Sequence, residues 1–164
     1  MDKPAFIPPA EKMHEAPTGD GPGPRRKLLM LEDDAELTEL LTSYLEQFGY
    51  DVVGADNGVE GLRLVMESDF DVILCDLVMP HLPGDMFYLA VERTKPHLTK
   101  RFIFMTGHRA DPKWDAFVRK VKGLILWKPF QLFELMERIK LIDAKLQADQ
   151  LQSAKKLSDS AGPV

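Results

Sequence analysis

The sequence holds a single cysteine, Cys75, and no apolar run long enough to cross a membrane. A membrane-spanning helix needs about 20 consecutive apolar residues, and one cysteine cannot build an internal disulfide framework. The N-terminal residues also lack the apolar core of a secretory signal peptide. We therefore expect a cytoplasmic protein without a membrane partner, in which Cys75 is a small core residue in a reducing compartment.

A surplus of positive charge is missing as well. The chain has 26 acidic residues against 21 lysines and arginines, which gives a net charge of −5. Nucleic-acid-binding domains carry a basic patch or stripe, so we expect no nucleic-acid partner. With 164 residues, 45% of them hydrophobic, the chain can bury one core in a domain of roughly 120 residues.

The most informative stretch is 71–84, where the apolar residues 72–75 lead directly into Asp76 and Pro80 follows. A short, unbroken apolar run is typical of a strand buried on both faces, as in parallel sheets. Ligands bind at the carboxyl ends of such strands, which predicts that Asp76 lies at the mouth of a site. From this stretch alone, an aspartate that only caps a turn or helix is an equal alternative.

Short strands and helical patterns alternate along the rest of the chain. The predicted strands are 27–31, 51–55, 72–75, 101–105 and 124–127, and the predicted helices cover 35–48, 58–67 and 86–93 and begin at 112 and near 131. Strict alternation predicts an α/β fold, a parallel sheet with helices on both faces. The helix after Asp111 is polar and weakly patterned, so we expect it to be the most mobile one.

The two ends of the chain differ in character from its centre. Residues 1–26 are rich in proline and glycine and have too few apolar side chains to offset the entropy of ordering, so we expect a disordered leader or linker. We expect 147–164 to extend the last helix and to fray from Ser158. An apolar stripe at spacing 3,4,3,4 is interpreted as packing on the sheet, in preference to a coiled coil. It consists of Leu132, Leu135, Ile139, Ile142 and Leu146.

Polar side chains follow four of the predicted strands and should meet at one edge of a parallel sheet. They are Glu32, Asp33, Asp76, Thr106 and Lys128. Three neighbouring carboxylates repel one another, and a divalent cation with oxygen ligands, Mg²⁺ above all, relieves the repulsion. With an ammonium and a hydroxyl nearby, the edge suits a phosphoryl group, and Asp76 is a candidate nucleophile. Helix caps, a strand-end threonine and a surface lysine are the less favoured interpretations.

The chain resembles the receiver (CheY-like) domain of bacterial two-component response regulators. The matching segments are LLMLEDD at 28–34, DVILCDLVMPHLPG at 71–84, FIFMTG at 102–107 and LWKPF at 126–130. The resemblance covers about residues 26–146 and implies a doubly wound, flavodoxin-like (βα)5 fold with strand order 2-1-3-4-5. It places the receiver domain at 27–146.

The resemblance also implies roles for the acidic residues. Asp76 matches the phosphoacceptor, which takes a phosphoryl group from a sensor histidine kinase or a histidine phosphotransfer protein. Asp33 and Asp76 would ligate Mg²⁺ together with the backbone carbonyl of Val78, and Glu32 would act partly through water. Val78 also occupies one of two positions that tune hydrolysis in the family, and His108 occupies the other.

Two further residues match the family, and one departs from it. Thr106 and Lys128 would bind the phosphoryl oxygens, with a cis peptide between Lys128 and Pro129. In the family, the threonine signals to the face of the fourth helix, fifth strand and fifth helix through a rotating aromatic switch. That position holds Ile125, which is stiff at χ1 and has no ring.

The resemblance implies a signalling protein and not an enzyme, since it would catalyse only its own phosphorylation and dephosphorylation. We expect a monomer or weak homodimer that contacts an unknown downstream protein. One alternative is a phosphorelay intermediate or phosphate sink, such as the receiver of a hybrid histidine kinase. Another is an interaction module that works without phosphorylation.

Overall fold

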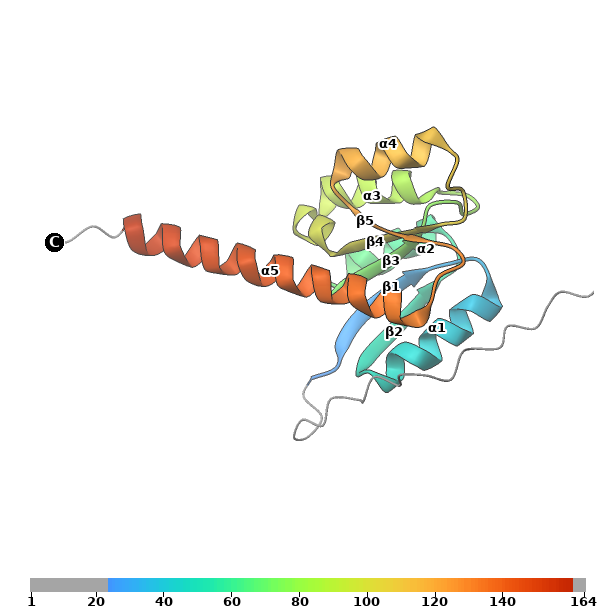
Figure 1. The fold of residues 1–164 in the computed structure, drawn as a ribbon, viewed down its shortest axis with the longest axis horizontal. Coiled ribbons are helices and arrows are strands. Elements are labelled where there is room, and N and C mark those ends of the chain that lie inside the picture. Colours follow the sequence, from blue (N-terminus) through green and yellow to red (C-terminus); the bar gives the residue numbers. More distant parts are fainter. Residues whose placement is uncertain (1–23, 161–164) are drawn as a thin grey trace, which may run out of the picture.

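The computed structural model describes residues 24–160, in which five strands alternate with helices (Figure 1). The strands are β1 (Arg26–Leu31), β2 (Tyr50–Ala55), β3 (Val72–Asp76), β4 (Phe102–Thr106) and β5 (Leu124–Trp127). The α-helices are α1 (Ala35–Gln47), α2 (Gly58–Glu67), α3 (Gly84–Thr94), α4 (Pro112–Val121) and α5 (Leu132–Ser160). A 3₁₀ helix, η1 (Pro96–Arg101), follows α3, where the sequence predicts only that Pro96 ends the helix.

The strands form one parallel sheet in the order β2-β1-β3-β4-β5, which confirms the predicted fold class and strand order. The register pairs Leu31 with Cys75 and Asp76 with Met105. The last residues of β4 and β5 lie opposite each other. The carboxyl ends of β1, β3, β4 and β5 therefore lie side by side along one edge, where the site is expected.

Helices cover both faces of the sheet, as Figure 1 shows. Successive strand residues point to opposite faces, so Leu29 and Leu31 join the apolar layer under α2, α3 and α4, whereas Leu28 and Met30 join the layer under α1 and α5. All five residues of β3 are buried. Burial on both faces explains the unbroken apolar run that precedes Asp76.

Helix α4 differs from its prediction. Trp114 and Val118 are buried, and Phe117 and Val121 pack partly buried against the same layer. These four residues follow the i, i+3, i+4, i+7 spacing of an amphipathic helix, so the weak pattern assigned to this helix was wrong. The ring of Phe117 lies 5.7 Å from the ring of Tyr88 in α3, which joins the two neighbouring helices.

Helix α5 packs on the sheet over its first half and projects beyond it over the second (Figure 1). Leu135, Ile139 and Ile142 are buried, which confirms that the apolar stripe packs on the sheet. Farther along, Leu151 is 70% exposed. The helix runs past Ser158, where fraying is predicted, to Ser160. Residues 1–23 of the predicted leader and residues 161–164 of the predicted tail lie outside the described part.

Two ion pairs hold α5 against the amino-terminal edge of the sheet. Arg26 at the start of β1 donates two hydrogen bonds to Asp143, at 2.6 and 2.8 Å. Lys100 in η1 donates to Asp149 at 2.6 Å, about two turns farther along the helix. Within residues 24–160, no helix combines the length and apolar character needed to span a membrane.

Candidate functional site

Three acidic residues follow β1, and they have different roles: one caps the next helix and two lie at the site. Asp34 is the N-cap of α1, because its side chain accepts hydrogen bonds from two backbone amides of the first turn, and aspartate is a favoured residue at this position. Glu32 is only 3% exposed, whereas Asp33 is exposed. Oε1 of Glu32 accepts from the backbone amide of Asp34 at 3.1 Å, and Oε2 accepts from Lys128 at 2.6 Å. Glu32 and Asp33 therefore remain at the strand end, outside the helix cap.

Asp76 is the last residue of β3 and is 5% exposed. Its Oδ1 accepts from the backbone amide of Val78 at 2.8 Å, and its Oδ2 accepts from Nζ of Lys128 at 2.5 Å. The following loop packs tightly, since a Cβ on Gly84 would lie 2.4 Å from the carbonyl oxygen of Asp76. The hydrogen bonds from Val78 and Lys128 thus fix the direction of the Asp76 carboxylate.

Lys128 joins the ends of three strands. Its Nζ donates to both Glu32 and Asp76, and its backbone amide donates to the carbonyl oxygen of Thr106 at 2.9 Å. The peptide bond to Pro129 is cis, as the resemblance implies. Thr106 is fully buried, and its Oγ1 accepts from the backbone amide of His108 at 3.1 Å. Its hydroxyl can still donate one hydrogen bond, as an oxyanion would require.

Charge at this edge is unbalanced, with three carboxylates around one lysine. Burial raises the pKa of Glu32, and the negative charge of Asp76 adds to the effect, while Lys128 opposes it. Burial acts to lower the pKa of Lys128, but its hydrogen bonds to Asp76 and Glu32 outweigh burial and the pKa rises. Lys128 is therefore a fixed positive charge.

The carboxylates also form a donor set for a cation. One ligand oxygen from each of Glu32, Asp33 and Asp76 lies within 4.8 Å of the other two. Such oxygen-only donors on a partly open edge fit Mg²⁺, which keeps several water ligands in protein sites. The residues present thus fit the metal that the sequence predicts.

A family model described as the response regulator receiver domain matches residues 28–140. The chain belongs to the response regulator receiver family. CpdR, a response regulator receiver protein of Brucella abortus, is 34% identical over 70% of this chain and 93% of its own length. The CpxR homolog of Haemophilus influenzae, a transcriptional regulatory protein, is 36% identical over 71% of this chain. This receiver spans about half of that regulator (49%) and of the Bacillus subtilis regulator YcbL (48%).

Solved structures of similar proteins share the receiver fold. A putative response regulator from Chloroflexus aurantiacus is 27% identical, with a TM-score of 0.66 over 73% of this chain and 98% of the other. The chemotaxis protein CheY4 of Vibrio cholerae is 25% identical, with a TM-score of 0.65 over 72% of this chain and 98% of the other.

The receiver brings six sequence-predicted site residues to one edge and leaves Ile125 apart from them. The six are Glu32, Asp33, Asp76, Val78, Thr106 and Lys128. Ile125 lies half-buried in β5 opposite Phe104 and packs against the layer under α4. Sequence patterns did not reveal that the guanidinium of Arg109, in the loop after Thr106, lies 5.6 Å from the ring centroid of Trp127.

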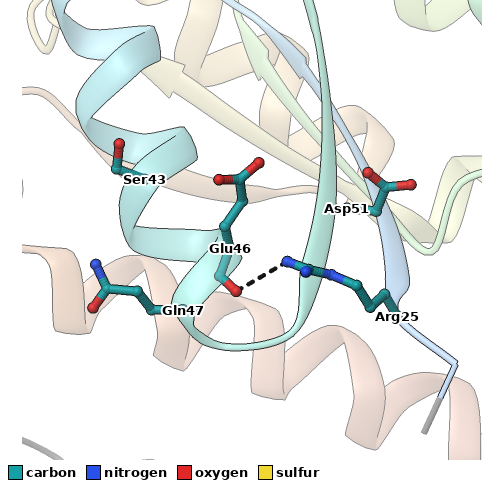
Figure 2. A pocket seen from close by; sticks show the side chains of 5 residues that line it. All are labelled: Arg25, Ser43, Glu46, Gln47 and Asp51. Atoms are coloured by element: carbon teal, nitrogen blue, oxygen red, sulfur yellow. Dashed lines mark hydrogen bonds between the residues drawn. The ribbon is translucent and has the colours of Figure 1, made fainter. Parts of the chain in front are cut away.

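Figure 2 shows a hollow at the other, amino-terminal edge of the receiver. It is lined by Arg25, Ser43, Glu46, Gln47 and Asp51. Arg25 donates to the carbonyl oxygens of Glu46 at 3.0 Å and Tyr50 at 2.8 Å, so its guanidinium ties the end of α1 to the start of β2. The lining includes none of the sequence-predicted site residues, and the hollow is separate from the acidic edge.

Proposed function

We propose that this receiver accepts a phosphoryl group on Asp76, with Mg²⁺, from the phosphohistidine of a sensor histidine kinase or a histidine phosphotransfer protein. The observation that carries the proposal is the position of Asp76 at the end of a buried strand. There Asp76 and Glu32 both accept hydrogen bonds from Lys128. A carboxylate oxygen of Asp76 also lies within 4.8 Å of oxygens of Glu32 and Asp33, close enough for all three to bind one cation. A nucleophile, a fixed cation and a set of oxygen donors are the groups that phosphoryl transfer needs.

Each side chain has a definite part in the proposed reaction. An oxygen of Asp76 attacks phosphorus and forms the acyl phosphate while the phosphorus–nitrogen bond to the donor histidine breaks. Lys128 neutralises the phosphoryl oxygens, and Thr106 donates its hydroxyl hydrogen to one of them. Mg²⁺, when held by Asp33, Asp76 and the carbonyl of Val78, with Glu32 acting partly through water, supplies further neutralisation of developing charge. The backbone amide of Val78 holds one oxygen of the Asp76 carboxylate in place.

The test of this function is labelling with a small phosphodonor. We expect amidophosphate with Mg²⁺ to add one phosphoryl group per chain, seen by intact mass, and the adduct to be hydrolysed by alkali as an acyl phosphate is. Failure of the wild-type protein to take up a phosphoryl group would favour the interaction module that works without phosphorylation.

Magnesium is expected to stabilise the receiver. Mg²⁺ binds the folded state only, so at about 100 times its dissociation constant it should raise the free energy of unfolding by about 2.7 kcal/mol. Asp33→Asn should remove most of this gain, measured as the shift of the thermal midpoint on adding MgCl₂. Asp34→Asn is the matched control, because asparagine still caps α1. An equal loss in both variants would contradict the assignment of Asp33.

Val78→Asn is expected to shorten the lifetime of the acyl phosphate several-fold. Val78 is 43% exposed next to Asp76, and an apolar side chain cannot orient an attacking water, whereas an amide can. The lifetime is followed by intact mass after the phosphodonor is removed. Val59→Asn, at a 59% exposed valine of α2, is the control. An unchanged or longer lifetime in Val78→Asn counts against the idea.

The output is proposed to pass through protein contacts on the face of α4, β5 and α5. Ile125 favours a second candidate, a relay intermediate or phosphate sink such as the receiver of a hybrid histidine kinase, since a receiver that only passes the phosphoryl group on needs no rotating ring at this position. Phosphoryl flux from Asp76 to a histidine phosphotransfer protein distinguishes the two. A cytoplasmic setting, with the thiol of Cys75 reduced, completes the proposal.

A further inference from the structure

The receiver lacks the ring through which the family is expected to link the acceptor site to α4. Ile125 occupies that position and lies half-buried against the layer under α4. A β-branched side chain is restricted at χ1, and isoleucine has no ring to exchange between buried and exposed positions. If a change at Asp76 reaches α4, other contacts must carry it.

The first of these contacts joins Asp76 to α3. Gly84 begins α3, and a Cβ at this position would lie 2.4 Å from the carbonyl oxygen of Asp76 and 2.9 Å from Cα of Leu77. The backbone amide of Gly84 donates to the carbonyl oxygen of Leu77 at 3.1 Å. The first turn of α3 therefore rests on the backbone of the acceptor itself, and interiors packed this closely transmit small displacements.

The second contact joins α3 to α4. Asp85 follows Gly84, and its side chain is only 15% exposed. Its Oδ2 lies 3.5 Å from Nζ of Lys113 in the first turn of α4, whereas its buried Oδ1 accepts no hydrogen bond from the described residues. One carboxylate oxygen is thus loosely paired and the other unpaired, which leaves the group free to form a closer contact.

Lys113 stands at the end of α4 where a positive charge is least favourable. The N-terminus of a helix carries partial positive charge, so a lysine there gains from a carboxylate on a neighbouring element. Its Nζ also lies 4.1 Å from the ring centroid of Trp114, which is 6% exposed in the layer between the sheet and α4. The side chain of Lys113 is 58% exposed, so Asp85 and Trp114 are its two close neighbours at the start of the helix.

We propose that the ion pair between Asp85 and Lys113, here named the α3–α4 bridge, couples the phosphorylation state of Asp76 to the position of α4. The proposal rests on the proposed function, because it gives that site a route to the output face. Helices α3 and α4 lie next to each other in Figure 1. A shift of the Asp76 backbone moves Gly84, tightens or loosens the bridge, and displaces the first turn of α4.

Hydrogen exchange of α4 tests the bridge, with beryllofluoride and MgCl₂ as the phosphoryl mimic. In the wild-type receiver, we expect the mimic to change exchange of the amides in 113–121 by at least twofold. Lys113→Gln and Asp85→Asn should each abolish more than half of this change at equal occupancy of the mimic. Lys120→Gln, at an exposed lysine of the same helix, should retain it. If Lys113→Gln shows the full change in α4 exchange on adding the mimic, the proposal is overturned. A lysine that only stabilised α4 would alter exchange without the mimic but would leave the change caused by the mimic intact.

A second measurement distinguishes failure of the α3–α4 bridge from failure of the proposed phosphorylation at Asp76. Occupancy is followed by ¹⁹F NMR of bound beryllofluoride, and a wild-type receiver that binds none contradicts the proposed function. The bridge is then judged without the mimic, by a double-mutant cycle of Asp85→Asn and Lys113→Gln on α4 exchange. Non-additive changes support the bridge, because residues in direct contact are coupled. Strictly additive changes overturn it.

Discussion

Asp76→Asn is expected to abolish phosphoryl labelling by amidophosphate and Mg²⁺ completely. The asparagine side chain has nearly the same shape and keeps an oxygen for the backbone amide of Val78, but an amide is not a nucleophile that forms an acyl phosphate. The fold should be retained, because asparagine keeps the acceptor for the amide of Val78, and Lys128 keeps its hydrogen bond to Glu32. Intact mass after labelling gives the result directly.

Asp71→Asn is the control for this loss. Asp71 immediately precedes β3 and accepts a hydrogen bond from the backbone amide of Lys27 at the opposite edge of the sheet, far from the acidic cluster. It should be labelled to the same extent as the wild-type protein. A mass increase of one phosphoryl group in Asp76→Asn would show that another residue is the acceptor.

Lys128→Met is expected to lower the free energy of unfolding by about 3 kcal/mol at neutral pH, because it leaves two buried carboxylates without their cation. The side chains of Glu32 and Asp76 are only 1% and 7% exposed. The deficit should shrink as the pH falls toward 4.5, the ordinary pKa of glutamate. Burial raises the pKa of Glu32 in the folded protein, so ionisation of Glu32 above pH 4.5 destabilises the fold. At lower pH the carboxyl group is protonated and neutral, so the loss of the Lys128 charge costs less. Urea unfolding at several pH values measures the effect.

Lys100→Met provides the comparison for Lys128→Met. It breaks the exposed ion pair with Asp149, whose side chains are 61% and 44% exposed, so it should change the free energy of unfolding by less than about 1 kcal/mol. Mg²⁺ should restore part of the stability lost in Lys128→Met, because a bound cation replaces the missing charge. Equal stability of the two variants at neutral pH would contradict the structural role of Lys128.

The sequence predicts the sheet well, because buried parallel strands have a distinctive composition. The run 72–75 is apolar at every position because β3 is buried on both faces, and a polar residue, Asp76, appears only at the carboxyl end of the strand. The N-cap at Asp34 also agrees with its residue type, since aspartate is favoured at that position. The spatial gathering of the site residues also follows, since parallel strands end on the same side.

Other features depend on contacts between distant segments and leave no periodic signal. The pairing of Asp85 with Lys113 requires the packing of α3 beside α4, which the order of residues does not specify. Helix α4 was misread because Trp114 and Phe117 are separated by charged and small residues, so the apolar stripe is narrow. The 3₁₀ turns of η1 were missed because proline signals the end of one helix and not the shape of the next segment.

The way in which α5 is held has a consequence for access to the receiver. Its first half packs on the sheet, ion pairs join the helix to Arg26 and Lys100, and its distal turns point away from the edge that holds Asp76. From Asp143 to Ser160 the helix extends about 25 Å at 1.5 Å per residue. A binding partner can therefore contact this part of α5 without covering Asp76. Phosphorylation of Asp76 and binding of the partner to α5 can then occur at the same time on one molecule.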